Sequence, residues 1–327
     1  MKTVNKFLLL GVVGFVMSPL YAFAQNVWPN GQTIRIIVPF TAGSGTDIIA
    51  RAVADKLAPS LGNGVSVVIE NKPGAGGTIG ALQVAKSEPD GFTLLVHSSG
   101  HVVNPALYKN LPYDTLNDFA GVIPLAQLPN VMVTSPANGY KNLDELIKKY
   151  SAHPGDANYA SAGNGSATHM NAEKFRVAAK LTANHIPYRG TPEAITDVIA
   201  GRTDWFFAPI VSAYPLIKDG KLQALAVGTK TRSPLLPNVP TTIELGIPNS
   251  DYTFWVGVLA PSKTPKAIID RLNTEITKLM KDPEVMERYA KLGAEPMVMK
   301  PAQFDQFIRQ ETEAAAALVR AANITIN

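Results

Sequence analysis

The sequence predicts an α/β protein of two domains, and two observations support this fold class. Strand-like and helix-like segments alternate along the chain, which is typical of parallel sheets joined by crossover helices. A glycine-rich turn between a strand and a helix also occurs twice, at 41–47 and, about 120 residues later, at 161–168. Such turns direct backbone N–H groups and the positive end of a helix toward one point. Two copies therefore suggest two domains that close on one anion.

The N-terminal residues predict export. Lys2 and Lys6 accompany an apolar run at 7–16, and Ala22-Phe23-Ala24 fits the rule for signal-peptide cleavage. We therefore expect a signal peptide over residues 1–24 and a periplasmic mature chain. A membrane anchor is the alternative, but the run is shorter than the ~20 residues that span a bilayer.

Composition excludes several classes of protein. The chain has no cysteine, so it carries no disulfide framework, thiolate metal site or lipid-modified cysteine. Its net charge is +4, and removal of Lys2 and Lys6 leaves 28 basic against 26 acidic residues, or +2. This small and dispersed charge does not predict nucleic-acid binding. The remaining length is sufficient for two α/β domains.

The segments follow in a regular order. Strands are predicted at 34–40, 65–69, 92–97, 131–134, 158–161, 184–187, 205–207, 224–227 and 252–259. Helices are predicted at 47–61, 79–86, 143–150, 168–179, 191–200, 264–280 and 304–322. The segments 124–134 and 252–259 are candidates for strands that cross between domains. We therefore expect a discontinuous domain 1 (25–126 plus 251–327) and a domain 2 (127–250), joined by a strand hinge.

The first glycine-rich loop offers neutral donors for a carboxylate. These are the hydroxyls of Thr41, Ser44 and Thr46 and the backbone around Gly45. The loop lacks the third glycine of a dinucleotide fingerprint, Asp47 would repel a pyrophosphate, and no Walker sequence is present. The alternative is that Thr46 or Asp47 only caps the helix.

The second loop has a similar set of small donors, and neither loop contains Lys or Arg. Its candidate residues are Ser161, Gly163, Asn164, Ser166 and Thr168. Capture by neutral donors and helix dipoles suits reversible binding, whereas arginine forks bind more strongly.

Signatures of catalysis and of metal binding are absent from the sequence. There is no Gly-x-Ser-x-Gly elbow and no His-Glu-x-x-His helix. Among five histidines only His97 and His101 are close in sequence, which is weak evidence for a metal. His101 is either near the ligand or an ordinary loop histidine, and His169 is expected to orient its loop. We predict no enzyme activity, no cofactor and no metal.

Aromatic residues are candidates for the walls of a cleft. Phe40, Tyr188 and Phe207 are expected to line it, whereas Phe206 is expected in the core. Such walls, with neutral donors nearby, suit a planar carboxylate.

The chain resembles the extracytoplasmic solute receptors of the tripartite tricarboxylate transporter family, the Bug receptors. The likeness covers essentially the whole mature chain and is carried, in order, by residues 36–47, 70–77, 89–95, 104–108, 111–114, 158–165, 187–190 and 236–241.

The resemblance implies a type II periplasmic binding protein fold, with a small carboxylate held in the interdomain cleft by hinge closure. It also implies delivery to inner-membrane transporter subunits, and we expect a monomer. The family's two ligand loops correspond to 41–47 and 161–168. The full set of expected ligand-binding residues is Phe40, Thr41, Ala42, Ser44, Gly45, Thr46, Asp47, Ser98, His101, Ser161, Gly163, Asn164, Ser166, Thr168, Phe207 and Ala208.

One departure bears on the ligand. Many relatives carry an Asp-Asn pair where this chain has Ala208-Pro209. Loss of the acid favours a dicarboxylate or an aromatic carboxylate, such as terephthalate, over a ligand that bears an amine. A sensing subunit and, less favoured, a secreted hydrolase or isomerase remain alternatives.

Overall fold

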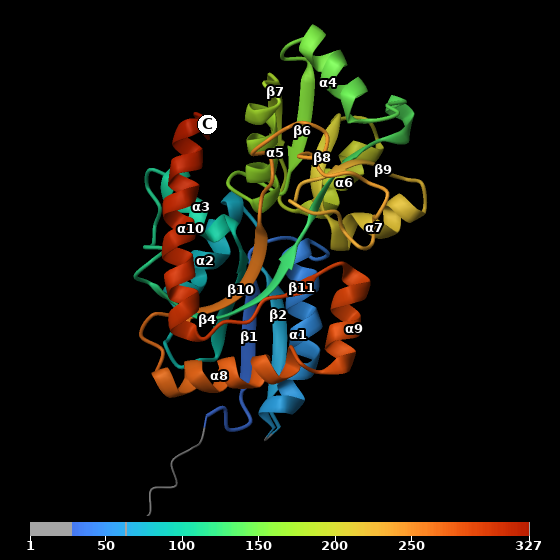
Figure 1. The fold of residues 1–327 in the computed structure, drawn as a ribbon. Coiled ribbons are helices and arrows are strands. Elements are labelled where there is room, and N and C mark those ends of the chain that lie inside the picture. Colours follow the sequence, from blue (N-terminus) through green and yellow to red (C-terminus); the bar gives the residue numbers. More distant parts are fainter. Residues whose placement is uncertain (1–27, 63, 327) are drawn as a thin grey trace, which may run out of the picture.

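Two β-sheets flanked by helices organise residues 28–62 and 64–326, the part of the chain that the computed structural model describes (Figure 1). The predicted α/β class is confirmed. The predicted signal peptide lies outside the described residues. Within those residues, no helix has the length and apolar character needed to cross a membrane.

The first sheet has six strands in the order β11-β4-β10-β3-β1-β2. Their bounds are β1 (Thr33–Val38), β2 (Ser66–Asn71), β3 (Thr93–Ser98), β4 (Phe119–Leu128), β10 (Phe254–Pro261) and β11 (Glu295–Pro296). Strand β1 runs parallel to β2 and β3, and β10 lies antiparallel between β3 and β4.

The second sheet has five strands in the order β7-β6-β8-β5-β9. Their bounds are β5 (Asn130–Thr134), β6 (Ala157–Ser161), β7 (Ala183–Pro187), β8 (Trp205–Pro209) and β9 (Gln223–Val227). The two sheets share one plan. In the first sheet β1 lies between β2 and β3, and in the second sheet β6 lies in the same way between β7 and β8. A strand that enters from the other half of the molecule lies antiparallel between the next two strands: β10 between β3 and β4, and β5 between β8 and β9.

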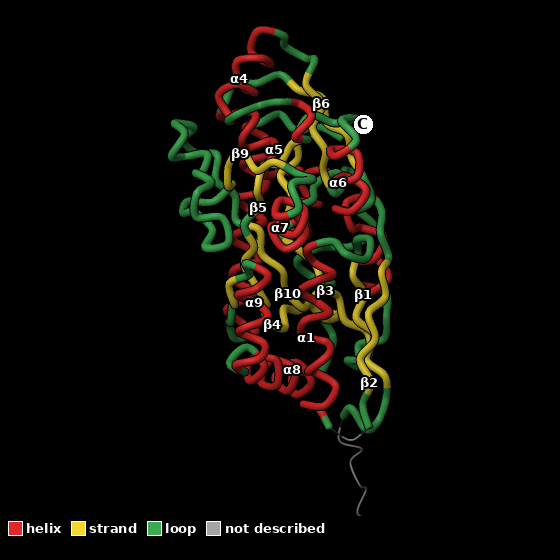
Figure 2. The backbone as a smooth tube through the Cα atoms, turned by 90° about the vertical axis from the view of Figure 1, so that its right-hand side faces the viewer, coloured by secondary structure: helices red, strands yellow, loops and turns green. Residues whose placement is uncertain are grey.

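Helices cover both sheets, and Figure 2 shows them on either side of the strands. With the first sheet lie α1 (Gly45–Leu61), α2 (Thr78–Ala85), α3 (Gly100–Leu107), α8 (Lys266–Leu279), α9 (Pro283–Leu292) and α10 (Pro301–Ala321). With the second lie α4 (Leu143–Ala152), α5 (Ala167–Ala178), α6 (Thr191–Ile199) and α7 (Ile210–Lys218). Two single-turn 3-10 helices are Ala75–Gly77 and Pro136–Asn138.

Helix α10 packs closely on the first sheet through Phe304. A Cβ atom at Gly257 of β10 would lie 2.4 Å from Phe304 Cζ, so glycine is needed there for the helix to approach. Trp255 meets the same ring edge to face at 5.6 Å between centroids. These contacts fix the strand that returns from the second sheet.

The chain crosses between the sheets at two places. Strand β4 passes directly into β5 through Pro129, and the segment after β9 returns to β10. Near the crossings, Gly228 N–H donates to the Asn130 carbonyl at 2.8 Å and Tyr252 N–H donates to the Gly228 carbonyl at 2.9 Å. The two crossing segments therefore lie side by side.

Candidate functional site

The two glycine-rich loops occupy equivalent positions in the two sheets. One follows β1 and leads into α1, and the other follows β6 and leads into α5. Each therefore leaves the carboxyl end of the strand at which the order of its sheet reverses, since β1 lies between β2 and β3 and β6 lies between β7 and β8. Ligands bind at such points in open α/β sheets. Ser44 and Ser166 are the N-cap residues of the two helices.

A small cavity of about 10 Å³ lies between these loops, which is about the room one water needs. No side chain in its lining carries a formal charge. The predicted residues in the lining are Phe40, Ser44, Gly45, Thr46, Ser98, Ser166 and Thr168. The lining also contains five residues that were not named for the ligand: Ala162, Ala167, Thr191, Pro209 and Phe254. Ala162 and Ala167 belong to the predicted second loop, and Pro209 to the pair that departs from the relatives.

Three helices begin at this inner cavity. Gly45, Ala167 and Thr191 are the first residues of α1, α5 and α6, and all three line it. The first N–H groups of a helix have no helical acceptor, and the helix dipole adds positive potential there. The cavity is thus electropositive without any cation, which suits an anion such as a carboxylate.

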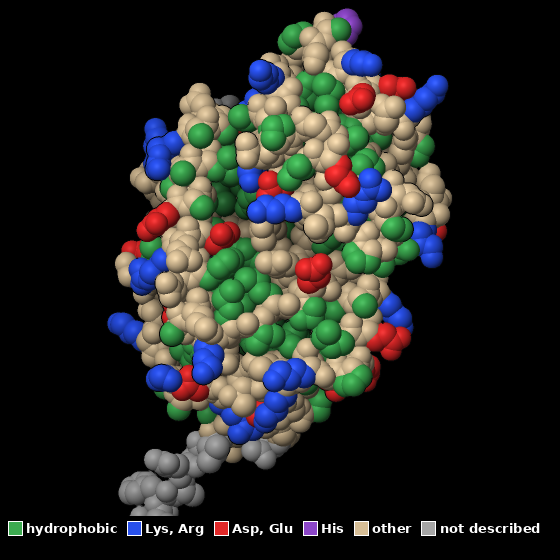
Figure 3. Space-filling view, in the orientation of Figure 1, with side chains coloured by type: hydrophobic (Ala, Val, Ile, Leu, Met, Phe, Trp, Pro, Cys, Tyr) green, Lys and Arg blue, Asp and Glu red, His purple; other side chains and the backbone are tan. Residues whose placement is uncertain are grey.

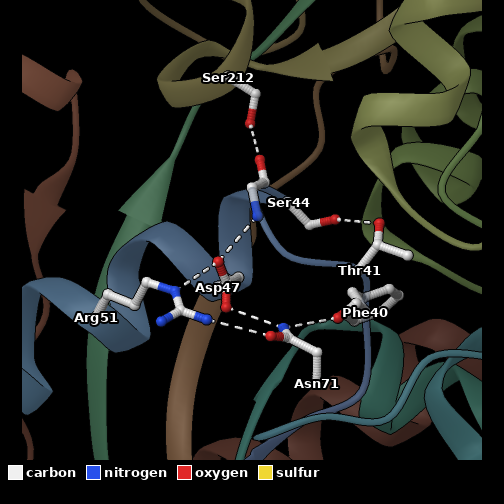
Figure 4. A network of polar contacts seen from close by, with 8 residues as sticks. Phe40, Thr41, Ser44, Asp47, Arg51, Asn71 and Ser212 are labelled. Atoms are coloured by element: carbon white, nitrogen blue, oxygen red, sulfur yellow. Dashed lines mark hydrogen bonds and ion pairs between the residues drawn. The ribbon is translucent and has the colours of Figure 1, made fainter. Parts of the chain in front are cut away.

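The two sides of the cleft are in direct contact. Thr191 N–H donates to Ser44 Oγ at 3.1 Å, and Thr41 Oγ1 donates to Glu193 Oε2 at 3.0 Å. Ser212 Oγ, from α7, donates to the Gly43 carbonyl at 3.1 Å (Figure 4). A Cβ atom at Gly190 would lie 1.9 Å from Thr41 Oγ1. The structure therefore has a closed cleft.

Asp47, predicted among the ligand residues, shapes the first loop and does not line the inner cavity. Its carboxylate accepts hydrogen bonds from Gly43 N–H, Arg51 Nε and Asn71 Nδ2, each at 2.9 Å (Figure 4). Burial alone would raise the pKa of this carboxyl, but the bonds from Arg51, Gly43 and Asn71 outweigh burial and lower it. Asp47 is therefore a paired carboxylate with no free side for a ligand amine.

His101, Phe207 and Ala208, also predicted for the ligand, lie away from the inner cavity. His101 is fully buried against Phe119, with ring centroids 4.9 Å apart. Phe207 packs in the core of the second sheet beside Phe175 at 5.5 Å. Ala208 is fully buried in the core as well. The aromatic walls of the inner cavity are instead Phe40 and Phe254.

Three further predicted residues lie near the cleft, but they line neither the inner cavity nor the outer cavity described below. Thr41 makes the closing contact with Glu193, and Ala42 is exposed at the tip of its loop. Ser161 lies behind the second loop, where its Oγ accepts from Gly163 N–H at 3.0 Å.

A larger outer cavity adjoins the inner one, and Phe40 and Ala162 line both. Its volume is about 430 Å³. The remaining lining residues are Gly74, Ala75, Gly76, Gly77, Gly163, Asn164, Pro187, Tyr188, Arg189 and Glu193. Arg189 and Glu193 are the charged groups among them. Figure 3 shows this protein's charged side chains dispersed over the visible face rather than gathered in one patch.

A third cavity, of about 450 Å³, lies by the crossing segments. It is bounded by residues 229–235, 251–254 and Gly293, and no residue predicted for the ligand lines it. The described residues also contain no group of three His, Asp or Glu side chains arranged to hold a metal ion. The predicted ligand residues that line one of these three cavities are therefore found at the inner and outer cavities.

Comparison with known proteins identifies the family. The model of the tripartite tricarboxylate transporter family receptor, TctC, matches residues 49–324. This chain belongs to that family. The TctC family is one of binding proteins, so the chain is a periplasmic solute receptor and not an enzyme. The predicted type II periplasmic binding protein fold is confirmed.

Three relatives of this TctC receptor show how close the likeness is. BugT of Bordetella pertussis is 36% identical over 317 residues, which cover 95% of this chain and 96% of BugT. The structure of R. palustris Rpa4515 with adipate is 30% identical, with a TM-score of 0.87 over 91% of this chain and 99% of that one. MatC from Rhodopseudomonas palustris with bound malate is 32% identical, with a TM-score of 0.82 over 88% and 99%.

Four histidines of the TctC receptor, three of them buried and His185 partly buried, make its stability depend on pH. Burial lowers the pKa of His101 to about 4 and those of His169 and His185 to about 3, and it lowers the pKa of His97 well below 6.5. Below pH 6.5 the unfolded chain therefore binds protons that the folded chain does not. The free energy of unfolding should fall as pH decreases from about 6.5 to 5, by up to about 1.4 kcal/mol per pH unit for each histidine.

Urea unfolding followed by circular dichroism at pH 7.5, 6.5, 5.8 and 5.0 measures this slope. The exposed His153 provides the control, because His153→Gln should leave the slope unchanged. A free energy of unfolding that stays constant between pH 7 and 5 contradicts the prediction.

Proposed function

We propose that this receptor captures a small dicarboxylate or aromatic carboxylate in the interdomain cleft and delivers it to inner-membrane transporter subunits. The observation that carries the proposal is the inner cavity, where three helices begin and no charged side chain is present. One carboxylate of the ligand fits this chemistry, since neutral N–H and hydroxyl donors bind it reversibly.

Entry of the ligand requires the cleft to open. An inner cavity of about 10 Å³ is too small for a carboxylate while the loops touch. The proposed division is into residues 25–126 plus 251–327 and residues 127–250, with the two crossing segments between them. Bending at these segments would separate the loops as a hinge does. The ligand then favours the closed form through contacts from both sides.

The surroundings of the inner cavity favour a second acidic or aromatic end over an amine. Pro209 presents an apolar wall there, and Asp47 is already paired with Arg51. The body of the ligand would extend past Phe40 into the outer cavity, where Arg189 offers a cation. The relatives with bound adipate and malate hold dicarboxylates, in agreement with this proposal.

A ligand panel tests the proposal directly. Calorimetry and thermal shift with adipate, malate, terephthalate, a tricarboxylate, benzoate and aspartate should show binding of a dicarboxylate or aromatic acid and little binding of aspartate. No binding to any carboxylate would overturn the proposal.

Substitution of Ser166 by alanine should weaken this binding about five- to tenfold, because a hydroxyl donor in the inner cavity is lost. Ser166 also caps α5 by accepting from His169 N–H. Asn142→Ala is a matched control, since Asn142 caps α4 in the same way, far from the cleft. Both variants should lose about 1 kcal/mol of stability, but only Ser166→Ala should lose affinity. Equal affinities in the two variants would remove Ser166 from the site.

Removal of the Arg189 guanidinium should reduce affinity for dicarboxylates selectively. Arg189→Ala should raise the Kd of a dicarboxylate about three- to tenfold, and leave that of a monocarboxylate of equal length unchanged. The exposed Arg202, which pairs with Asp197 outside both cavities, is the control. An equal loss of affinity for the dicarboxylate and the monocarboxylate would show that Arg189 does not recognise the second carboxylate.

Loss of the Glu193 carboxylate should shift the ligand-free receptor toward an open form. Glu193→Ala removes the acceptor for Thr41 Oγ1, and one such bond corresponds to about a fivefold change in the ratio of closed to open molecules. Because the chain has no cysteine, Lys148→Cys and Lys281→Cys place two spin labels on exposed sites of the two halves. The label separation should increase in Glu193→Ala and stay near that of the parent in Glu193→Gln, whose amide oxygen still accepts. Identical separations in all three proteins would contradict the prediction.

A further inference from the structure

The second cleft loop rests on two stacked histidines. His169 lies in the first turn of α5 and His185 lies in β7. Their rings are nearly parallel, at 11°, with centroids 3.9 Å apart. Tyr159 of β6 continues the stack at 5.0 Å from His185. The pair therefore joins a helix and two strands directly behind the loop.

Both histidines connect to backbone N–H groups of the loop. Gly165 N–H donates to His169 Nδ1 at 3.1 Å. His185 Nε2 lies 2.6 Å from Ser161 Oγ, and that oxygen accepts from Gly163 N–H at 3.0 Å. Two glycine N–H groups, two positions apart in the chain, are thus held, Gly165 directly by His169 and Gly163 through Ser161 by His185.

These anchors add to two hydrogen bonds within the loop, from Ser166 N–H to the Gly163 carbonyl at 3.0 Å and from Ala162 N–H to Thr168 Oγ1 at 2.9 Å. Gly163 and Gly165 have φ of 118° and 74°, a region that favours glycine. Glycines lose the most conformational freedom on ordering, and they have no side chain that packs. The hydrogen bonds that fix the glycine backbone therefore help to set the position of the next residue, Ser166, whose N–H donates to the Gly163 carbonyl.

The arrangement requires neutral rings. His169 Nδ1 accepts a hydrogen bond, so it carries no proton. The pKa of each histidine is lowered to about 3, chiefly by burial. The charge of Arg176 also lowers the pKa of His169, and His169 also lowers the pKa of His185, while Glu173 acts to raise the pKa of His185. Glu173 is itself occupied by Tyr159 OH and by Arg176 at 2.7 Å. Both rings are therefore uncharged at neutral pH.

We propose that His169 and His185 are positioning residues, a stacked pair that fixes Gly163 and Gly165 so that the donors of the second loop face the inner cavity. The ordering of the loop is independent of the ligand. Its consequence for affinity rests on the proposed capture of a carboxylate.

Two substitutions at one position separate the acceptor from the stack. His169→Phe keeps an aromatic ring against His185 and removes the acceptor for Gly165 N–H. His169→Asn removes the ring and keeps an oxygen near the place of Nδ1. Hydrogen exchange of the 161–168 segment, measured by mass spectrometry on the ligand-free protein, should accelerate about five- to tenfold in His169→Phe and stay near the parent in His169→Asn.

The affinity for adipate, or for whichever carboxylate of the panel binds the parent, should be reduced in the variant whose loop exchanges faster and retained in the variant whose loop exchanges like the parent. His169→Phe should raise Kd about five- to tenfold, and His169→Asn should restore it even if its melting temperature is lower. Ser161→Ala is the second variant: it breaks the link from His185 to Gly163 N–H and should accelerate exchange in the same segment.

Three outcomes would overturn the proposal. One is parent-like exchange in both His169→Phe and Ser161→Ala. Another is exchange in the two His169 variants that follows only their melting temperatures. The third is loop exchange that changes as expected while affinity does not. If the parent binds no carboxylate, the proposed function fails, and the exchange data still decide whether the histidines order the loop.

Discussion

The arrangement of the cleft depends on the N–H groups that helices leave unpaired where they begin. Helices α1, α5 and α6 all begin at the inner cavity, so their dipoles converge on one small volume, although Thr191 N–H of α6 is already bound to Ser44 Oγ. That convergence requires the two halves to approach without side chains between them. Glycine makes the approach possible: a Cβ atom at Gly76 would lie 1.9 Å from the Asn164 carbonyl oxygen.

The backbones of the two glycine-rich loops are held in place by different chemistry. The first is shaped by a charged network, in which Asp47 accepts from Gly43 N–H and is neutralised by Arg51. The second is shaped by neutral rings, His169 and His185, which hold Gly165 and Gly163. In both loops the groups that fix the backbone lie behind it. The cavity itself therefore keeps a neutral lining, and its positive potential comes from the backbone.

The sequence could predict the two loops because each combines a strand, small residues and a helical pattern within a short window. It could not predict how far along β8 the cleft begins. All five residues of that strand are buried, and Phe207 and Pro209, two residues apart, share one face of the strand. Phe207 packs in the core, whereas Pro209, at the carboxyl end of the strand, lines the inner cavity. The role of Asp47 did have a signal, because Arg51 follows it at the i+4 spacing of helical ion pairs.

The helices α3, α7 and α9 were missed for local reasons. Helices α3 and α7 are short and contain Pro105 and Pro215, which interrupt a helical pattern. Helix α9 follows α8 after a turn of a few residues. The contribution of Thr191 to the cavity depends on how α6 packs across the cleft, which is a tertiary property that no local pattern encodes.

The closing contacts place a limit on how tightly a ligand is held. Thr41 donates to Glu193 and Ser44 accepts from Thr191 N–H while the cleft is closed, so two candidate ligand groups are already engaged between the halves. A ligand shifts the equilibrium only by the difference between its contacts in the closed and open forms. A ligand that bonds to Thr41 or Ser44 must replace a bond that already holds the empty cleft closed. Such a contact therefore favours the closed form less than a contact with an unoccupied helix N–H group does. Selectivity should therefore depend on the helix starts for the first carboxylate and on Arg189 for the far end, while the Thr41–Glu193 bond sets how readily the empty cleft closes.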